Sequence, residues 1–219
     1  MARIPLLQLS RLALTFGGAP IFDGLDLVVQ PGDRVALVGR NGSGKSTLLN
    51  WMIGDLPSAF AASGELWLDQ QRCDGLPVEA RGIGILFQDD LLFAHLSVGQ
   101  NLAFALPAAV RGAQRRMAVE QTLADMGLAG FHDRDPATLS GGQRARVSLM
   151  RTLLARPRAL LLDEPFSKLD AVLRVQFRAF VFEQIEQLQL PTLLVTHDAA
   201  DVPPGARVLN ISDWQVGDA

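Results

Sequence analysis

The 219-residue sequence contains one cysteine, no tyrosine and only two lysines among its 20 basic residues. The single cysteine, Cys73, excludes an internal disulfide and any metal site built from several cysteines, which is typical of a reducing compartment. The longest apolar stretch, residues 102–110, contains Pro107 and falls well short of the roughly 20 residues that a membrane-spanning helix needs. Pro5 and Gln8 interrupt the N-terminal apolar stretch before a signal-peptide core forms. We therefore expect a cytoplasmic protein that does not cross a membrane.

A concentrated positive charge is also missing. The net charge is −3, the isoelectric point is about 5.6, and no block of five like charges occurs. Binding to a nucleic-acid backbone needs a clustered positive surface, so the composition predicts no nucleic-acid partner. With 48% hydrophobic and 20% charged residues, the chain can bury a substantial core, which excludes intrinsic disorder.

Three short apolar runs predict strands that are covered on both faces. They are residues 34–39, 159–163 and 192–196. Helical patterns at residues 46–53 and 169–188 follow the first two, and a short turn follows the third. Unbroken apolarity over four or five residues is typical of parallel strands between helices. The sequence therefore predicts an α/β fold with a mainly parallel sheet.

Two other regions depart from that pattern. Residues 6–16 and 21–29 alternate in polarity around a Gly-Gly-Ala-Pro turn and predict an antiparallel hairpin, with another short strand pair at 64–69 and 71–73. The stretch from about 89 to 156 has no convincing strand and predicts helices at 98–106, 114–126 and 141–155. We expect an antiparallel β subdomain and a helical subdomain, about residues 88–157, inserted into an α/β core of about 1–87 and 158–219.

Residues 39–46 fit the pattern G-x-x-x-x-G-K-[ST] between an expected strand and an expected helix. Its glycines let backbone N–H groups point at phosphate oxygens, reinforced by the helix N-terminus. Lys45 would supply a compact positive charge to the β- and γ-phosphates, and Ser46 would bind Mg²⁺. The expected nucleotide contacts are Gly39, Arg40, Asn41, Gly42, Ser43, Gly44, Lys45, Ser46 and Thr47. The fold class this predicts is a P-loop NTPase core.

Two adjacent carboxylates, Asp163 and Glu164, end the expected strand at 159–163. Ligands of open α/β sheets bind at such strand ends, and two acids repel there unless a cation joins them. We expect Asp163 to bind Mg²⁺ and Glu164 to orient or deprotonate an attacking water. For the dipeptide by itself, a solvated strand end is the favoured explanation; the phosphate loop nearby shifts the interpretation to a catalytic one.

Residues 139–143, Leu-Ser-Gly-Gly-Gln, begin the expected helix at 141–155. Ser140 is a natural N-cap, and the two glycines expose the first-turn N–H groups to an anion. A well-capped helix alone would explain these residues. Together with the phosphate loop and the acidic pair in this order, however, the pentapeptide resembles the signature of ABC transporter ATPase subunits.

That resemblance covers essentially the whole chain and implies a dimer in which two copies sandwich two ATP molecules head to tail. The residues that would face the partner's nucleotide are Ser140, Gly141, Gly142 and Gln143. Gln88 matches the Q-loop glutamine, which contacts Mg²⁺ and the membrane partner, and His197 matches the switch histidine at the γ-phosphate. Asp170 matches the D-loop aspartate at the dimer interface, next to Lys168, where the family more often has a small residue.

The family usually stacks adenine on an aromatic residue, often tyrosine, which this chain lacks. Phe16 takes that position and would keep the stacking without a phenolic hydrogen bond. Phe16 as part of the hairpin core is the alternative.

The resemblance implies an ATP-hydrolysing subunit on the cytoplasmic side of the membrane, coupled to permease subunits and a periplasmic substrate-binding protein. Residues 85–88 and 92–101 resemble importers for sulfate, iron, thiamine or polyamines, and we expect this chain to lack the C-terminal regulatory domain that many of them carry. Apolar Leu91, Leu92 and Phe93 predict a permease contact around residues 88–96, in the groove between the α/β core and the helical insertion, or else they seal that junction.

A regulatory role in a membrane complex is the alternative function. A role on DNA or ribosomes fits poorly, because residues 89–138 leave no room for a long coiled coil and the chain has one cassette.

Overall fold

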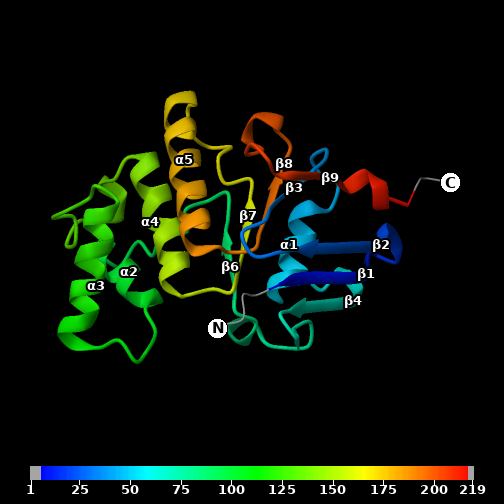
Figure 1. Cartoon of the computed structure of the whole chain (residues 1–219), viewed down its shortest axis with the longest axis horizontal. Helices are drawn as coiled ribbons and strands as arrows, with labels where there is room; N and C mark the ends of the chain where they lie inside the picture. Colours follow the sequence, from blue (N-terminus) through cyan, green and yellow to red (C-terminus); the bar gives the residue numbers. More distant parts are fainter. Residues whose placement is uncertain (1–5, 217–219) are drawn as a thin grey trace. The chain divides into compact units, whose positions relative to one another are not determined.

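The computed structural model in Figure 1 describes residues 6–216, which form two compact units. Within the described chain, the first unit contains residues 6–85, Arg158–Glu164 and residues 182–216. The second contains Leu86–Pro157 and Pro165–Val181. The expected subdomain boundaries near residues 88 and 157 stay a prediction. No helix within residues 6–216 is both long and apolar enough to cross a bilayer.

The predicted α/β fold with a mainly parallel sheet is confirmed. Its five strands lie in the order β6 (Ile83–Leu86), β7 (Ala159–Asp163), β8 (Thr192–Thr196), β3 (Arg34–Val38) and β9 (Arg207–Asn210). Strand β8 pairs in parallel with β7 and β3, and β3 pairs in parallel with β9. Residues 159–162 and 193–195 are buried, as expected for strands covered on both faces.

Strand β9 is not predicted from the sequence. Among residues 6–216 it pairs only with β3, as an edge strand, and Arg207, Val208 and Asn210 are exposed. Since half-buried edge strands need no continuous apolar run, these four residues carry no strand signal. Their position matters, because β9 leads into the segment that forms one wall of the cavity described below.

The predicted hairpin is confirmed as part of a four-stranded sheet with the order β2-β1-β4-β5. Strands β1 (Leu7–Phe16) and β2 (Ala19–Val29) pair antiparallel, and β4 (Phe60–Leu68) and β5 (Gln71–Arg72) extend the sheet. Strand β4 begins at Phe60 rather than at the expected Gly64, because its first residues pair with the end of β1, where Phe16 lies opposite Phe60.

A bulge in β1 keeps its apolar side chains on one face. Arg11 has a positive φ of 48°, and the pairing register shifts beside it. The buried side chains of β1 are therefore Leu7, Leu9, Leu12 and Leu14. Opposite the bulge, Gly64 has φ 131°, and a Cβ there would lie 2.7 Å from the Leu12 Cα. Only glycine fits where the two backbones approach so closely.

The helix that follows β3, α1 (Lys45–Ile53), is anchored at its C-terminus by a buried arginine. The Arg81 guanidinium donates to the carbonyl oxygens of Trp51 at 2.8 Å and Met52 at 3.0 Å, and it also binds the carbonyls of Asp74 and Leu76. An unpaired buried acceptor costs about 1–3 kcal/mol, so Arg81 stabilises the end of this helix.

The second unit contains the three predicted helices, α2 (Val98–Ala105), α3 (Gly112–Asp125) and α4 (Gly141–Leu154). Figure 1 shows them beside one another. Their shared core comprises Val98, Leu102, Leu106, Val119, Leu123, Met126, Leu128, Leu139 and Val147. The first part of α5 (Ala171–Leu188) also belongs to this unit. Short 3₁₀ turns complete the described chain at Val78–Ala80, Pro136–Thr138, Ala199–Asp201 and Ile211–Trp214.

A buried asparagine fixes the loop that precedes α2. The Asn101 amide donates to the carbonyl oxygens of Phe93, Leu96 and Ser97 at 3.0–3.1 Å, and its oxygen accepts from the Phe93 N–H at 2.8 Å. One fully buried side chain thus holds residues 93–97 in place.

Candidate nucleotide site

The loop between β3 and α1 has the local geometry of an anion site. Gly42 and Gly44 have positive φ values of 80° and 91°, so they let the backbone curl at a place where other residues would be strained. Gly44 is the N-cap of α1 and offers no side-chain cap, whereas the serines before α2 and α4 cap their helices. The first-turn N–H groups of α1 are thus left to an anion that binds at the helix end.

Lys45 is buried in this loop. Its Nζ donates to the carbonyl oxygens of Gly39 at 2.9 Å and Arg40 at 2.8 Å. Burial lowers the pKa of Lys45, and the nearby carboxylates of Glu164 and Asp163 oppose that change. The compact ammonium therefore lies between the loop and two acids, where a phosphate group would replace the loop carbonyls as its partner.

Ser46 and Asp163 meet although they are far apart in the sequence. The Ser46 hydroxyl donates to Oδ1 of Asp163 at 2.9 Å. Burial raises the pKa of Asp163, and the adjacent Glu164 raises it further, against the opposing effects of Ser46 and Lys45. A hydroxyl and a carboxylate oxygen are hard ligands of the kind that Mg²⁺ prefers, and a cation would offset the cost of burying this acid.

Glu164 lies directly after β7 and contacts His197 after β8. Its Oε2 lies 3.0 Å from Nδ1 of His197, and its N–H donates to the Val195 carbonyl at 3.0 Å. Glu164 has a positive φ of 47°, an uncommon conformation for a residue with a side chain. The two strand ends thus bring a carboxylate and an imidazole within hydrogen-bonding distance.

Sequence reasoning missed the residues that hold the His197 loop. Asp201 is buried, and its Oδ2 accepts a hydrogen bond from the Thr196 hydroxyl at 3.3 Å. Thr196 also accepts from the Asp198 N–H at 3.1 Å. His197 is predicted by its resemblance to a family motif, whereas Thr196 and Asp201 belong to no spaced pattern that would predict their roles.

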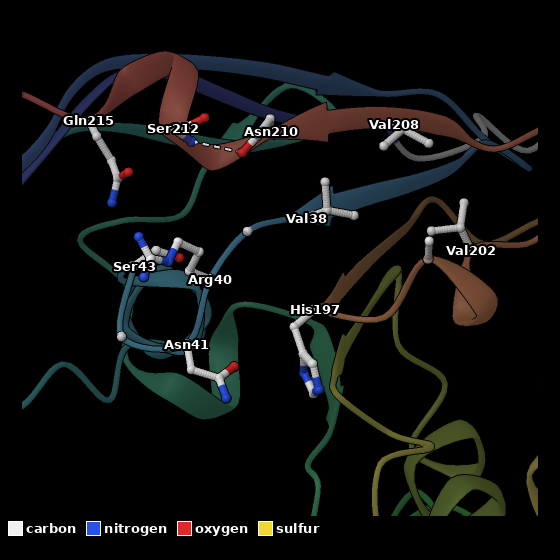
Figure 2. Close-up of a pocket in the computed structure, with 13 residues that line it drawn as sticks. Val38, Arg40, Asn41, Ser43, His197, Val202, Val208, Asn210, Ser212 and Gln215 are labelled. Carbon is white, nitrogen blue, oxygen red and sulfur yellow. Dashed lines mark hydrogen bonds between the residues drawn. The ribbon is translucent and has the colours of Figure 1, made fainter.

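A cavity of about 870 Å³ lies beside the phosphate loop. Figure 2 shows Arg40, Asn41 and Ser43 of the loop on one side, with His197 across the opening from Asn41. The end of strand β9 and the turn that follows it form the other wall, with Asn210, Ser212 and Gln215. This wall is not predicted from the sequence, because β9 carries no strand signal.

The expected signature residues begin α4 in the second unit. Ser140 and Gln143 form a capping box, in which the Ser140 hydroxyl accepts from the Gln143 N–H at 3.3 Å and the Gln143 amide oxygen accepts from the Ser140 N–H at 2.9 Å. A Cβ at Gly142 would lie 3.1 Å from Leu173, so this glycine serves packing. A Cβ at Gly141 would find its nearest neighbours at 3.9 Å, so the fold of the described chain does not itself require glycine there.

Two other expected residues of the second unit have distinct surroundings. Gln88 is exposed and lines a cavity of about 410 Å³ together with Gly141 and Lys168. Asp170 accepts hydrogen bonds from the N–H groups of Val172 at 3.1 Å and Leu173 at 2.9 Å, and thereby caps the start of α5. Asp170 thus has a structural task that the sequence analysis did not assign.

Phe16 lies at the tip of the β1–β2 hairpin. It is 53% exposed, and its ring centroid lies 4.9 Å from that of Phe60. Its role in the hairpin core, the alternative drawn from the sequence, is therefore wrong. The neighbouring strand β2 contacts the phosphate loop, since a Cβ at Gly44 would lie 3.0 Å from Ile21 and 3.2 Å from Phe22.

The expected site residues thus form two sets. In the first unit, the fold brings together Lys45, Ser46, Asp163, Glu164 and His197. In the second unit, Gln88 and Gly141 line one cavity, while Ser140 and Gln143 lie with Gly142 beside another. The family model for ABC transporters matches residues 22–167. The chain belongs to the ABC transporter ATP-binding family. It is an ATP-binding ATPase subunit with the fold of that family.

Several proteins resemble this ABC ATPase over most of its length. An uncharacterized ABC transporter ATP-binding protein of Escherichia coli, YnjD, is 52% identical over 209 residues, which is 95% of this chain and 96% of that protein. The thiamine import ATP-binding protein ThiQ of Haemophilus influenzae is 43% identical and matches 81% of both chains. The sulfate/thiosulfate import ATP-binding protein CysA of Gloeobacter violaceus is 43% identical over 87% of this chain, which spans about half of that protein (55%).

Burial of Asp163 predicts that this residue lowers the stability of the ABC ATPase without nucleotide. Because the pKa of Asp163 is raised in the folded state, the free energy of unfolding falls as pH rises from the ordinary pKa of an aspartate through this raised pKa. Asp163→Asn removes the charge and keeps an acceptor for Ser46. We expect the nucleotide-free variant to melt roughly 1–3 °C higher at pH 7, with a smaller difference near pH 4, in a thermal unfolding series. A variant of an exposed acid, Asp213→Asn, serves as control; a lower melting temperature of Asp163→Asn at pH 7 would contradict the account.

Proposed function

We propose that this chain binds Mg-ATP on its phosphate loop, dimerises around two nucleotides and uses hydrolysis to drive a membrane permease that imports a solute. One observation carries the proposal: the first unit gathers a buried lysine, a serine–aspartate pair and a glutamate–histidine pair at the ends of its parallel strands. Such a set of side chains can bind a phosphate and a divalent cation and can orient an attacking water.

Each residue of this set has a separate proposed task. Lys45 and the N–H groups at the start of α1 bind the β- and γ-phosphates. Ser46 and Asp163 hold Mg²⁺, with Gln88 as a further ligand; the ion, when bound, neutralises charge on the phosphates. Glu164 accepts a proton from the attacking water, and the 3.0 Å contact with His197 orients its carboxylate.

The second unit supports the proposal that another copy completes each site. Gly141 begins α4, and a Cβ there would make only ordinary contacts at 3.9 Å, so packing within the chain does not require glycine and its small size fits close approach by a group outside the chain. The capping box uses the N–H groups of Ser140 and Gln143 and leaves those of Gly141 and Gly142 outside it. We infer that Ser140, Gly141, Gly142 and Gln143 contact the γ-phosphate of the nucleotide bound by the second copy.

The exposed aromatic ring of Phe16 supports a role in stacking adenine. A half-exposed phenylalanine at a hairpin tip gains apolar contact when a flat ring covers it. Without a phenolic hydroxyl, the chain has no hydrogen bond from this residue to the base, so we expect weak selectivity among purine nucleotides.

An exposed apolar patch on the second unit supports a permease contact. Phe104 is 68% exposed and Leu91 is 55% exposed. The Phe93 ring lies edge-on to that of Phe104 at 4.9 Å, and the Arg151 guanidinium lies 5.1 Å from the Phe93 ring centre. We infer that a short cytoplasmic segment of the permease covers this patch and holds the ATPase to the cytoplasmic side of the membrane.

The transported solute is set by other subunits. The relatives named above import thiamine in one case and sulfate or thiosulfate in another, yet both are 43% identical to this chain. This equal identity fits an ATPase whose sequence does not depend on which solute is transported. We propose that the permease, with a periplasmic substrate-binding protein, selects the solute.

The dimer and the role of Glu164 are tested by Glu164→Gln. The amide keeps the shape of the side chain but cannot accept a proton, so we expect ATP to bind and hydrolysis to fall at least 100-fold. ATP should then hold two copies together, and size-exclusion chromatography with light scattering should show a dimer with ATP and a monomer with ADP. A monomer at saturating ATP would contradict both the sandwich and the proposed base.

The permease contact is tested by Phe104→Ser. Because this ring is mostly exposed, its loss should leave ATP binding and melting temperature near wild type while it weakens copurification of the permease. Met117→Ser, at another exposed apolar residue of the second unit, is the matched control and should keep the permease. Equal permease recovery from both variants would place the contact elsewhere.

A further inference from the structure

The second of the chain's two lysines forms an ion pair that the proposed mechanism does not use. Lys168 Nζ contacts Oδ1 of Asp89, the residue that follows Gln88. The chain uses arginine for nearly every other positive charge, and its first lysine lies in the phosphate loop. Lys168 lies two residues before Asp170, so this pair joins the segment of Gln88 to the segment that caps α5.

Stability does not account for this pair. Both side chains are more than half exposed, at 52% for Lys168 and 64% for Asp89. Exposed pairs of this kind contribute little to folding, because solvent screens the charges and two flexible side chains must be ordered. An effect of the pair must therefore come from the positions of the two segments that it joins.

Asp90 provides a second link from the same segment. Its Oδ2 lies 3.2 Å from Nε of Arg144, and Arg144 donates to the Leu139 carbonyl at 2.6 Å. The Asp90 carbonyl accepts from the Ser148 hydroxyl at 2.7 Å. The segment after Gln88 is thus held on one side by α4, which begins beside Ser140, and on the other side by Lys168.

The three joined segments surround one cavity. Gln88, Asp89, Gly141 and Lys168 all line the cavity of about 410 Å³ in the second unit. Gln88 and Gly141, which we assign to the nucleotide and the second copy, thus line the same cavity as the Asp89–Lys168 and Asp90–Arg144 pairs. The Asp90–Arg144 pair has further hydrogen bonds to support it, whereas the Asp89 side chain reaches the segment of residues 165–170 through Lys168.

We propose that the Asp89–Lys168 ion pair is a positioning contact for hydrolysis: it sets the spacing between Gln88 and the segment that contains Asp170. This inference rests on the proposed function, because Gln88 acts at Mg-ATP and Asp170 lies at the second copy. Since ATP binds first to the phosphate loop of the other unit, loss of the pair reduces kcat and leaves KM for ATP nearly unchanged.

A charge swap in the full-length chain tests the pair with Mg-ATP as substrate. Asp89→Lys and Lys168→Asp, made singly, each place like charges together and should lower kcat by roughly tenfold, with KM changed less than about twofold. The double variant restores opposite charges and should recover kcat to within about threefold of wild type. Melting temperatures should stay within about 1 °C for all three variants, because the pair is exposed.

A second exposed pair provides the matched control. Arg116 and Glu120 lie 3.8 Å apart on α3, far in sequence from the three joined segments, and Arg116→Glu or Glu120→Arg should leave kcat unchanged. Single variants with wild-type kcat would overturn the inference, and so would a double variant that is as slow as the single variants. In either case, hydrolysis of Mg-ATP by the wild-type chain would still support the proposed function. A wild-type chain that forms no ATP dimer and hydrolyses no Mg-ATP would overturn the proposed function, and this inference with it.

Discussion

Two adjacent carboxylates at the end of a buried strand are the constraint around which the first unit is organised. Asp163 and Glu164 repel each other, and burial of Asp163 adds to the cost, which is seen in its raised pKa. The groups that contact these carboxylates come from two other strand ends: Lys45 and Ser46 follow β3, and His197 follows β8. The parallel order of β7, β8 and β3 places these ends at one edge of the sheet, where charge that is costly to bury becomes useful around a phosphate and a cation.

The second unit contributes a different kind of surface, made of helix and loop ends with their own internal caps. The two glycines of the signature differ in their surroundings: a Cβ at Gly142 would lie tightly against Leu173 at 3.1 Å, whereas a Cβ at Gly141 would make only ordinary contacts at 3.9 Å. Ser140 and Gln143 already satisfy each other in the capping box. The proposed site thus needs little rearrangement within α4, and its missing half is the phosphate loop of a second copy.

Sequence reasoning succeeded where structure is encoded by neighbouring residues. The buried parallel strands, the helix after the glycine-rich loop and the three helices of the second unit all follow from short local patterns. It failed where a residue depends on a distant partner. Arg81 caps a helix that ends near Met52, Asp201 holds Thr196, and edge strand β9 becomes a strand only beside β3. Asp170 was assigned to the dimer interface by resemblance, while its capping of α5 could be recognised only from the fold.

The account's central claim is that each ATP site combines the phosphate loop of one chain with the signature helix of another. Hydrolysis by covalently tethered heterodimers tests it directly. With Lys45→Ala in one copy and Ser140→Arg in the other, one site carries both defects and one carries neither, so partial activity should remain. With both substitutions in the same copy and a wild-type partner, each site carries one defect, and activity should fall to background. The reverse order of activities would show that each chain builds its site alone and would contradict the account.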